Sequence, residues 1–428
     1  MKSIFKRFVT YLLVKEAAYL LRRHQPTIIA ITGSVGKTTA KDAIYAAIKN
    51  SVSARKSEKS FNSDIGVPLT VLGLPNAWSS PLGWCKNLMD GALAALFSKE
   101  YPAVLVLETG IDRPGDMATL TKWLKPDIVV MTRLPDVPVH VEFFPTPEAV
   151  AIEKMHLAAA LKPDGTFIYN HDDTILEAQA ATVRQTHVTF GRYLEADFKG
   201  LQDAIVYDAD TPTGVSFFIT HIGQRYPVTL QGTVGSHQVY ACAAALAVAA
   251  TLGIELSAAA QSLSELRTPN GRLRLIPGVK ASMILDDTYN ASPAATELAL
   301  QTLGEIKYAK RKIAVLGDML ELGRFSSEAH EQVGTIAARV ATHLVTVGVR
   351  ARKIAEGALE AGLTEKNIYQ YDDMARAGRE LQAFLQPGDV VLVKASQGMR
   401  AELLVEEIMA APETAESVLV RQEAHWKR

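Results

Sequence analysis

The sequence predicts an α/β protein in which two domains, each built on a mostly parallel sheet, follow a short amphipathic helix. Three observations lead to this fold class. From Thr27 onward, short β-rich runs alternate with longer segments of helical periodicity. Most of these runs are apolar throughout, which is typical of parallel strands covered on both faces. The 428 residues also have room for about three domains of ordinary size.

The composition excludes several classes of protein. Hydrophobic residues make up 48% of the chain and charged residues 21%, as in an ordinary soluble protein. The formal net charge of −1 gives no reason to expect a nucleic-acid partner. Cys85 and Cys242 stand too far apart to suggest a disulfide framework or a cysteine metal site, so we expect a reducing cytoplasm. The sequence has no apolar run of about 18 residues, so it predicts no transmembrane helix.

Residues 1–25 predict a basic amphipathic helix. Apolar residues recur at helical spacing from Ile4 to Leu21, and six basic residues stand against one acid, Glu16. Such a helix is either docked on its own domain or lies in the surface of a membrane. The sequence leaves both interpretations open.

The first α/β unit follows this helix. Four runs, "TIIAIT", "AVLVLETG", "DIVVMTRL" and "GTFIYN", predict buried parallel strands, with helices over 39–49 and 146–161 between them. Residues 186–232 alternate polar and apolar side chains, which predicts an antiparallel edge. A strong helix then starts at His237 and ends at Gly253.

A second α/β unit of Rossmann-like type begins near Pro269 to Arg272, where "ASMILDD", "KIAVLGD", "HLVTVG" and "DVVLVKAS" alternate with helices. We expect the segment after Pro412 to be a charged tail that frays. The predicted division is therefore 1–25, 26–270, 271–412 and 413–428.

The most informative motif is the turn after the first strand. It consists of Gly33, Ser34, Val35, Gly36, Lys37, Thr38 and Thr39 and leads into a helix. Backbone N–H groups of a glycine loop and of the helix behind it form an anion site. In a phosphate loop, Lys37 would reach the β- and γ-phosphates and the Thr38 hydroxyl would bind Mg²⁺. Ile31 stands where the longer G-x4-G-K-T motif has its first glycine, so the pattern is the shorter G-x-x-G-K-T-T.

Magnesium also needs carboxylates, and Glu108 is one candidate. It ends the strand "AVLVLE" and so would lie at the carboxyl edge of the sheet, where ligands collect. A solvated loop residue is an equally good interpretation of Glu108 alone. His140 and Lys154 carry no signal beyond that of ordinary surface residues.

The order of the motifs resembles that of the Mur ligases of peptidoglycan synthesis, in particular the branch that adds D-alanyl-D-alanine. The resemblance runs from about residue 27 to residue 407 and is carried by "ITGSVGKTT", "SFNSDIGVPLTVL", "LETGIDRPGDM", "GRLRLI", "DDTYNASP", "LGDMLELG" and "VLVKASQGMRAE".

This resemblance implies a central ATPase domain, a C-terminal Rossmann-like domain and an ADP-forming ligase reaction. ATP would convert a carboxylate of a muramoyl-peptide precursor into an acyl phosphate, which the amine of D-Ala-D-Ala then attacks. It further implies two Mg²⁺ ions and a lysine carbamylated by CO₂.

The resemblance also assigns roles to residues. Catalysis would rest on Lys37, Glu108, His140, Lys154 and Arg272, with Thr38, Glu108, His140 and carbamylated Lys154 as metal ligands. His237, Arg272, Asp287 and Asn290 would contact the nucleotide. Asn62 would contact the muramoyl peptide, and Lys394 and Ser396 would lie on the amine side. Gln238 and Ala241 stand where the family has asparagines near the nucleotide, so the adenine contacts should differ.

Two departures from the family concern substrate and location. About 26 residues precede the first strand, too few for the uridine-binding domain that the resemblance implies there, so we expect that domain to be missing. The segment 82–98 predicts an extra amphipathic helix, either a packed lid or a membrane contact. Together with residues 1–24 it could form one apolar surface at the inner face of the membrane.

Three functions remain open at this stage. The first is a ligase that acts on a muramoyl peptide, and the second is a ligase of the same chemistry on a polyglutamate or lipid-linked peptide. The third is a nucleotide-binding scaffold without catalysis. Retention of Lys37, Glu108, His140 and Lys154 argues against the scaffold, which would need neither metal ligands nor a modifiable lysine.

Overall fold

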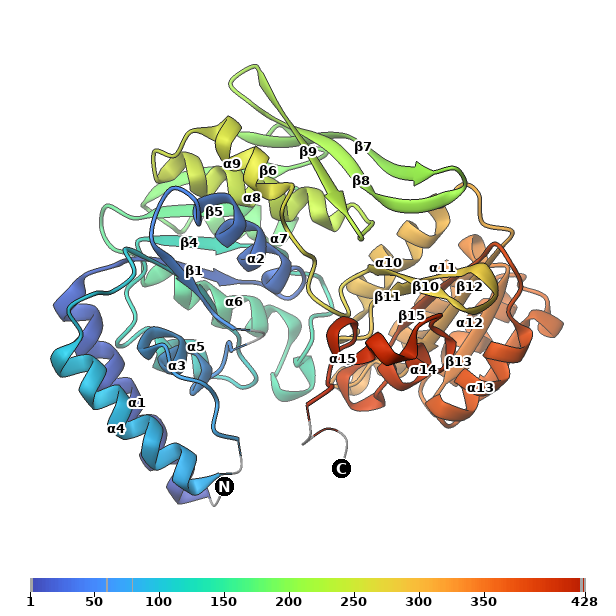
Figure 1. The fold of residues 1–428 in the computed structure, drawn as a ribbon, viewed down its shortest axis with the longest axis horizontal. Helices are drawn as coiled ribbons and strands as arrows, with labels where there is room; N and C mark the ends of the chain where they lie inside the picture. Colours follow the sequence, from blue (N-terminus) through green and yellow to red (C-terminus); the bar gives the residue numbers. More distant parts are fainter. Residues whose placement is uncertain (1–2, 59–60, 79, 424–425, 427–428) are drawn as a thin grey trace.

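Two sheets, joined by one connection near residue 270, organise the chain (Figure 1). The structure is a computed structural model and describes residues 3–58, 61–78, 80–423 and 426. Within these residues a nine-stranded sheet is followed by a six-stranded one, so the predicted α/β class is confirmed.

The first sheet has the order β2-β3-β1-β4-β5-β6-β7-β8-β9. The predicted strands all form, and short β2 and long β7 join them. Strand β1 lies between β3 and β4, and all three run parallel. The bounds are β1 (Thr27–Thr32), β2 (Ala54–Lys56), β3 (Val104–Glu108), β4 (Ile128–Met131), β5 (Thr166–Asn170), β6 (Thr186–Gly191), β7 (Phe198–Asp208), β8 (Thr211–His221) and β9 (Gln224–Gln231).

Helices cover both faces of this sheet because neighbouring strand residues point to opposite sides. Ile29 and Ile31 pack in one core with α2 (Lys37–Ile48), α8 (His237–Thr251) and α9 (Leu256–Leu263). Ile28 and Ala30 pack in the other core. This second layer holds α1 (Ser3–His24), α3 (Gly66–Leu72), α4 (Pro81–Phe97), α5 (Asp116–Leu120), α6 (Pro147–Ala159) and α7 (Thr174–Ala180).

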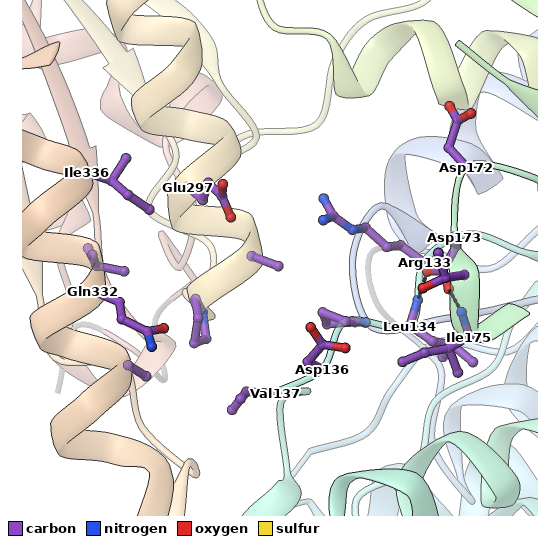
Figure 2. Close-up of a pocket in the computed structure, with 16 residues that line it drawn as sticks. Arg133, Leu134, Asp136, Val137, Asp172, Asp173, Ile175, Glu297, Gln332 and Ile336 are labelled. Atoms are coloured by element: carbon purple, nitrogen blue, oxygen red, sulfur yellow. Dashed lines mark hydrogen bonds between the residues drawn. The ribbon is translucent and has the colours of Figure 1, made fainter. Parts of the chain in front are cut away.

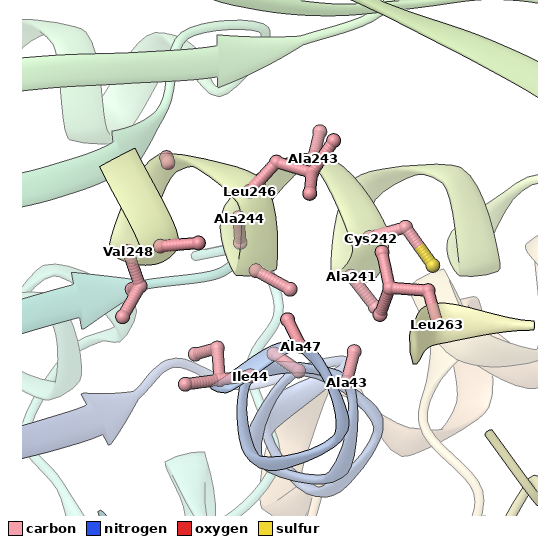
Figure 3. Packing of buried hydrophobic residues seen from close by; sticks show 14 of the residues in the cluster. Ala43, Ile44, Ala47, Ala241, Cys242, Ala243, Ala244, Leu246, Val248 and Leu263 are labelled. Atoms are coloured by element: carbon pink, nitrogen blue, oxygen red, sulfur yellow. The ribbon is translucent and has the colours of Figure 1, made fainter. Parts of the chain in front are cut away.

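Small side chains let α8 approach α2 closely. Ala43 and Ala47 of α2 face Ala241 and Ala244 of α8 in the core shown in Figure 3. Because α2 begins at the phosphate loop, this packing fixes the direction in which the start of the helix points.

The antiparallel edge predicted for residues 186–232 is confirmed in part. Strands β7, β8 and β9 pair antiparallel, whereas β6 is still parallel to β5. The arm formed by β7–β9 extends above the junction of the two domains (Figure 1).

The second sheet has the order β10-β11-β15-β12-β13-β14, with only β10 antiparallel among its described strands. Its strands are β10 (Arg274–Gly278), β11 (Ser282–Asp286), β12 (Arg311–Gly317), β13 (His343–Val347), β14 (Ile368–Tyr371) and β15 (Asp389–Lys394). Helices α10 (Pro293–Glu305), α11 (Ser326–Val340) and α12 (Arg352–Glu360) cover one face. Helices α13 (Met374–Phe384) and α14 (Glu402–Ile408) cover the other.

The C-terminal segment differs from the expected frayed tail over part of its length. Helix α15 (Ala415–Val418) is followed by Arg421, whose guanidinium donates hydrogen bonds of 2.6 Å to the Thr288 carbonyl and to Glu402. These contacts hold the segment through residue 421 against the loop after β11. The last residues lie partly outside the described part of the chain.

Helix α1 is docked on its own domain, as one of the two interpretations predicted. It buries Val9, Leu13, Ala17 and Leu20 and lies beside α4. Gly91 of α4 makes this possible, because a Cβ there would lie 2.2 Å from the Glu16 carboxylate. None of the described helices is long and apolar enough to cross a bilayer.

Because the carboxyl group of Glu16 is partly buried, we expect the free energy of unfolding to depend on pH. Burial raises its pKa from 4.5 to about 7, and its Oε2 has no hydrogen-bond partner among the described residues. The folded state therefore binds this proton more tightly than the unfolded state. The stability linked to it is complete below pH 4.5 and is lost as the pH rises through 7.

We expect Glu16→Gln to raise the free energy of unfolding above pH 7 by about 1–2 kcal/mol, a value reduced for the group's partial exposure. At pH 4.5 the variant and the wild type should differ little. Urea unfolding at the two pH values measures this, and an equal effect at both would contradict it.

Candidate functional site

The phosphate loop between β1 and α2 is held in shape by the end of β4. Gly33 and Gly36 adopt positive φ values of 143° and 87°. A Cβ at Gly33 would lie 2.1 Å from the Thr132 hydroxyl, which itself donates to the Val35 carbonyl at 2.7 Å. The Ser34 N–H donates to the Arg133 carbonyl, also at 2.7 Å. The two residues that follow β4, Thr132 and Arg133, thus brace the loop from outside.

The start of α2 offers an anion site. The helix begins at Lys37, and Gly36 before it provides no side-chain cap. Its first N–H groups therefore remain available to a ligand. The ammonium of Lys37 donates to the Gly33 carbonyl at 2.9 Å, across the loop. Burial lowers the pKa of Lys37, while Glu108 opposes this and Arg272 adds to it. A bound phosphate would provide a negative charge beside this buried ammonium.

Glu108, at the end of β3, lies directly beside the loop. It is 1% exposed, and its Oε1 accepts hydrogen bonds from Thr38 and Asn62, each 3.2 Å long. Its Oε2 lies 3.7 Å from the buried ammonium of Lys41 and accepts no hydrogen bond from the described residues. A buried carboxylate oxygen without a donor, next to a threonine hydroxyl, is a donor set that suits a magnesium ion.

Arg272 brings the domain junction to the phosphate loop. Its Nη2 lies 3.4 Å from the Thr38 hydroxyl, and its guanidinium lies over the Tyr289 ring at 4.2 Å from the centroid. The preceding Gly271 has a positive φ of 68° and accepts a hydrogen bond from the Tyr289 N–H. The connection between the sheets therefore places the guanidinium of Arg272 next to the start of α2.

A second group of predicted residues gathers where the C-terminal domain meets the start of α8, the helix that begins with His237. Lys394 donates to Asp287 at 2.6 Å and to the Asn290 carbonyl at 2.9 Å. Burial lowers the pKa of His237 to about 4, with Asp287 opposing and Lys394 adding to the shift. Lys394, which the resemblance placed on the amine side, thus lies with the residues expected at the nucleotide. The Ser396 hydroxyl instead accepts from the Leu320 N–H at 2.8 Å.

His140 and Lys154 are arranged differently from each other. His140, with a φ of 69°, has Nδ1 2.6 Å from Glu321 of the C-terminal domain and Nε2 3.7 Å from Asp112. Lys154 on α6 is 3% exposed. Its pKa is lowered to about 7, mainly by burial; the charge of Lys37 adds to this shift and that of Asp112 opposes it. Lys154 therefore interacts electrostatically with Lys37 of the phosphate loop, whereas His140 is paired with Asp112 and Glu321.

The described residues contain no group of three His, Cys, Asp or Glu side chains that could hold a metal ion. Magnesium is commonly bound by one or two carboxylates together with substrate phosphates, so Thr38 and Glu108 remain a suitable protein contribution.

Several residues of the site were not predicted. Asp112 follows Glu108 in the same loop, and Glu321 stands in "LGDMLELG", so both lie in motifs that were already noticed. Lys41 lies one helical turn after Lys37, a spacing that places both on one face. Thr132 and Arg133 had no sequence signal, because their role depends on β4 lying next to β1.

Two cavities lie between the domains. The one in Figure 2 has a volume of about 260 Å³, with Arg133 and Asp136 on the central-domain wall and Glu297 and Gln332 on α10 and α11. The other, of about 240 Å³, runs from Gly36 at the loop to the residues around α8. Its further lining includes Val35, Asn170, Asp172, Phe190, Tyr193, His237, Tyr240 and Ala241.

Gln238 and Ala241, the residues expected to change the adenine contacts, lie at the start of α8. Gln238 is fully buried and donates to the Thr233 hydroxyl at 2.9 Å, away from the cavity. Ala241 lines the cavity without a polar group, and Tyr240 donates to Asp172 at 2.9 Å. Asp172 and Tyr240 are therefore among the polar groups that line this cavity, whereas Gln238 is not.

Comparison with known proteins gives consistent matches over most of the chain. Residues 87–249 match the family described as Mur ligase middle domain, and residues 271–397 match the one described as Mur ligase, glutamate ligase domain. The UDP-N-acetylmuramoyl-tripeptide–D-alanyl-D-alanine ligase of Bacillus subtilis is 31% identical over 386 residues, 90% of this chain and 76% of that protein. The ligase of the same name from Mycobacterium leprae is 31% identical over 89% of this chain and 73% of its own.

A solved structure is similar as well. The MurF ligase of Thermotoga maritima in complex with ADP has a TM-score of 0.76 at 28% identity. The superposition covers 95% of this chain and 84% of that one.

The close approach at Gly33 generates a prediction. We expect Gly33→Ala to weaken ATP binding by about tenfold or more, roughly 1.4 kcal/mol, because the new Cβ must displace Thr132 or the loop. Gly115→Ala is the control, since Gly115 has a φ of 90° with no atom within 4 Å of its Cβ position. Titration calorimetry with ATP and Mg²⁺ measures both, and wild-type affinity in Gly33→Ala would contradict the role of the loop.

Proposed function

Because the chain belongs to the Mur ligase family, we propose that it is an ATP-dependent, ADP-forming ligase that joins D-alanyl-D-alanine to a muramoyl-tripeptide precursor of peptidoglycan. One observation carries this proposal. The Thr38 hydroxyl of the phosphate loop lies 3.2 Å from the Glu108 carboxylate and 3.4 Å from Arg272 at the domain junction. The two relatives at 31% identity carry this activity in their names.

The proposed reaction requires that a carboxylate become an electrophile. A carboxylate oxygen attacks the γ-phosphorus of ATP, and ADP leaves. The amine of the second substrate then attacks the acyl carbon, the bond to phosphate breaks, and the amine loses a proton. Catalysis of such steps consists mainly of positioning and of neutralising charge on phosphoryl oxygens.

The residues of the chain suit these tasks. The N–H groups at the start of α2 and the ammonium of Lys37 can hold the β- and γ-phosphates. Arg272 reaches the same place from the junction, so it can add its charge to the transferring phosphoryl group. The cavity between Gly36 and Tyr240 leaves room for the nucleoside.

Two magnesium ions complete the proposed site. Thr38 and Glu108 would hold one, and His140 and Lys154, the latter as its carbamate with CO₂, would hold the second. The ions supply positive charge to the transferring phosphoryl group. The environment of Lys154 supports the carbamate: it is buried, it forms no ion pair among the described residues, and the charge of Lys37 disfavours its ammonium form. A carbamate would turn this repulsion into attraction.

We place the protein in the cytoplasm, at the inner face of the membrane through residues 1–24 and 82–98. The free thiols of Cys85 and Cys242 suit a reducing compartment.

A phosphate-release assay tests the reaction. We expect ATP hydrolysis to ADP and phosphate only when both UDP-muramoyl-tripeptide and D-Ala-D-Ala are present, because each half of the reaction needs its own substrate. Release with a polyglutamate or a lipid-linked peptide in place of the UDP-linked one would assign another acceptor. No release with any of these would favour a non-catalytic scaffold.

Lys154→Arg tests the carbamate. Arginine keeps the positive charge but cannot form a carbamate, so we expect ligase activity to fall by at least about 10²-fold while ATP still binds. Lys162→Arg is the matched control on a half-buried lysine that pairs with Asp127. With ¹³C-labelled bicarbonate, the wild type and the control should show a carbamate carbon signal that Lys154→Arg lacks. An active Lys154→Arg variant refutes the metal role.

A further inference from the structure

Helix α4 presents an apolar face to solvent. Its inward face packs on the domain through Trp84, Asn87, Gly91 and Ala95, a spacing of three to four residues. The opposite face repeats at the same spacing, yet it is apolar as well. Its exposed apolar residues are Leu82, Cys85, Met89, Leu93, Leu96 and Phe97. The charged side chains beside them are Lys86 and Asp90, which form an ion pair of 2.6 Å.

The exposure of these side chains is large. Leu82 is 82% exposed, Phe97 69% and Met89 60%. A helix of 17 residues is about 25 Å long, so the side chains form a stripe of that length. Soluble proteins seldom leave a row of this kind without a partner.

Helix α1 adds aromatic and basic groups beside this stripe. Phe8, Tyr11 and Tyr19 are between 44% and 58% exposed. Arg23 at the end of α1 donates to the carbonyls of Ala95 and Leu96 at 2.8 and 2.6 Å, which fastens the end of α4 to it. The two helices therefore form one unit on the side of the central domain away from the C-terminal domain (Figure 1). We call this unit, residues 3–24 and 81–97, the helix pair.

The charge of the helix pair differs from that of the rest of the chain. The pair contains six basic residues, five of them on α1, and two acids, Glu16 and Asp90, which gives a formal charge of +4 in a chain whose net charge is −1. Lys15 and Arg22 are exposed on α1. In an anionic lipid surface, phosphates lie above acyl chains. Basic residues can contact the phosphates while the apolar and aromatic residues beside them enter the acyl layer.

We propose that the helix pair binds the surface of an anionic lipid bilayer, with the exposed stripe of α4 in the acyl boundary and the basic residues of α1 at the phosphates. The helices lie in the plane of the surface, since none of the described helices can span it. The binding leaves the phosphate loop and the domain junction free, because those lie on other elements. It therefore holds or fails independently of the ligase reaction.

Flotation with vesicles tests this surface on the intact chain. The wild type should float with vesicles that contain phosphatidylglycerol. It should float less with vesicles of phosphatidylcholine alone, which carry no net negative charge to attract the basic residues, and less at high salt, which screens this attraction. The triple variant Met89→Glu, Leu93→Glu, Phe97→Glu should lose about tenfold or more in partitioning, since three exposed apolar side chains no longer enter the lipid. All three lie at the surface, so its folding and its ATP binding should persist.

A matched control carries the same change elsewhere. Ile222, Val349 and Leu359 are 87%, 71% and 49% exposed and lie outside the helix pair. Ile222→Glu, Val349→Glu, Leu359→Glu should float like the wild type. The proposal is overturned if the wild type stays in the dense fraction with anionic vesicles, or if the α4 variant floats as well as the wild type. It is also overturned if sedimentation without lipid shows that the wild type is a dimer and the α4 variant a monomer, because the stripe then binds a second copy of the chain.

Discussion

A buried carboxylate at the edge of the first sheet is the feature on which the site depends. Glu108 is almost fully enclosed, and burial of an ionised group is costly unless charges and donors surround it. Lys41 and Thr38 from α2 and Asn62 from the loop before α3 provide them. These groups can meet only because β3 lies directly beside β1, the strand that leads into the phosphate loop. The strand order thus joins the anion-binding turn to the carboxylate.

The second domain completes the site from across the junction. Arg272 approaches Thr38, Glu321 contacts His140, and burial near the Asp287–Lys394 pair lowers the pKa of His237. All of these contacts depend on how the two sheets are placed relative to each other. An enzyme that assembles its charges in this way can couple domain closure to the exclusion of water. The two cavities lie between the same two domains, and His237 lines one of them.

The helix pair obeys a different constraint. Its inner residues follow the usual rule that apolar side chains pack on a core, and the buried face of α1 belongs to the same core as the sheet. The outer face of α4 departs from that rule over a continuous row of side chains, whereas residues such as Ile222 and Val349 are exposed at single positions. Local departures of this kind are expected where a surface has a function, because stability alone would favour polar residues there.

Local patterns in the sequence determined the α/β class, the phosphate loop, most strands and both helices of the helix pair, since apolar periodicity and glycine turns act over a few residues. The short strand β2 and the docked segment near Arg421 were missed, because their partners are distant in the chain. Only the tertiary structure decided that Thr132 braces the loop, that Lys394 pairs with Asp287, and that His140 meets Glu321. Such contacts depend on strand order and domain placement, which a linear pattern of residue types does not specify.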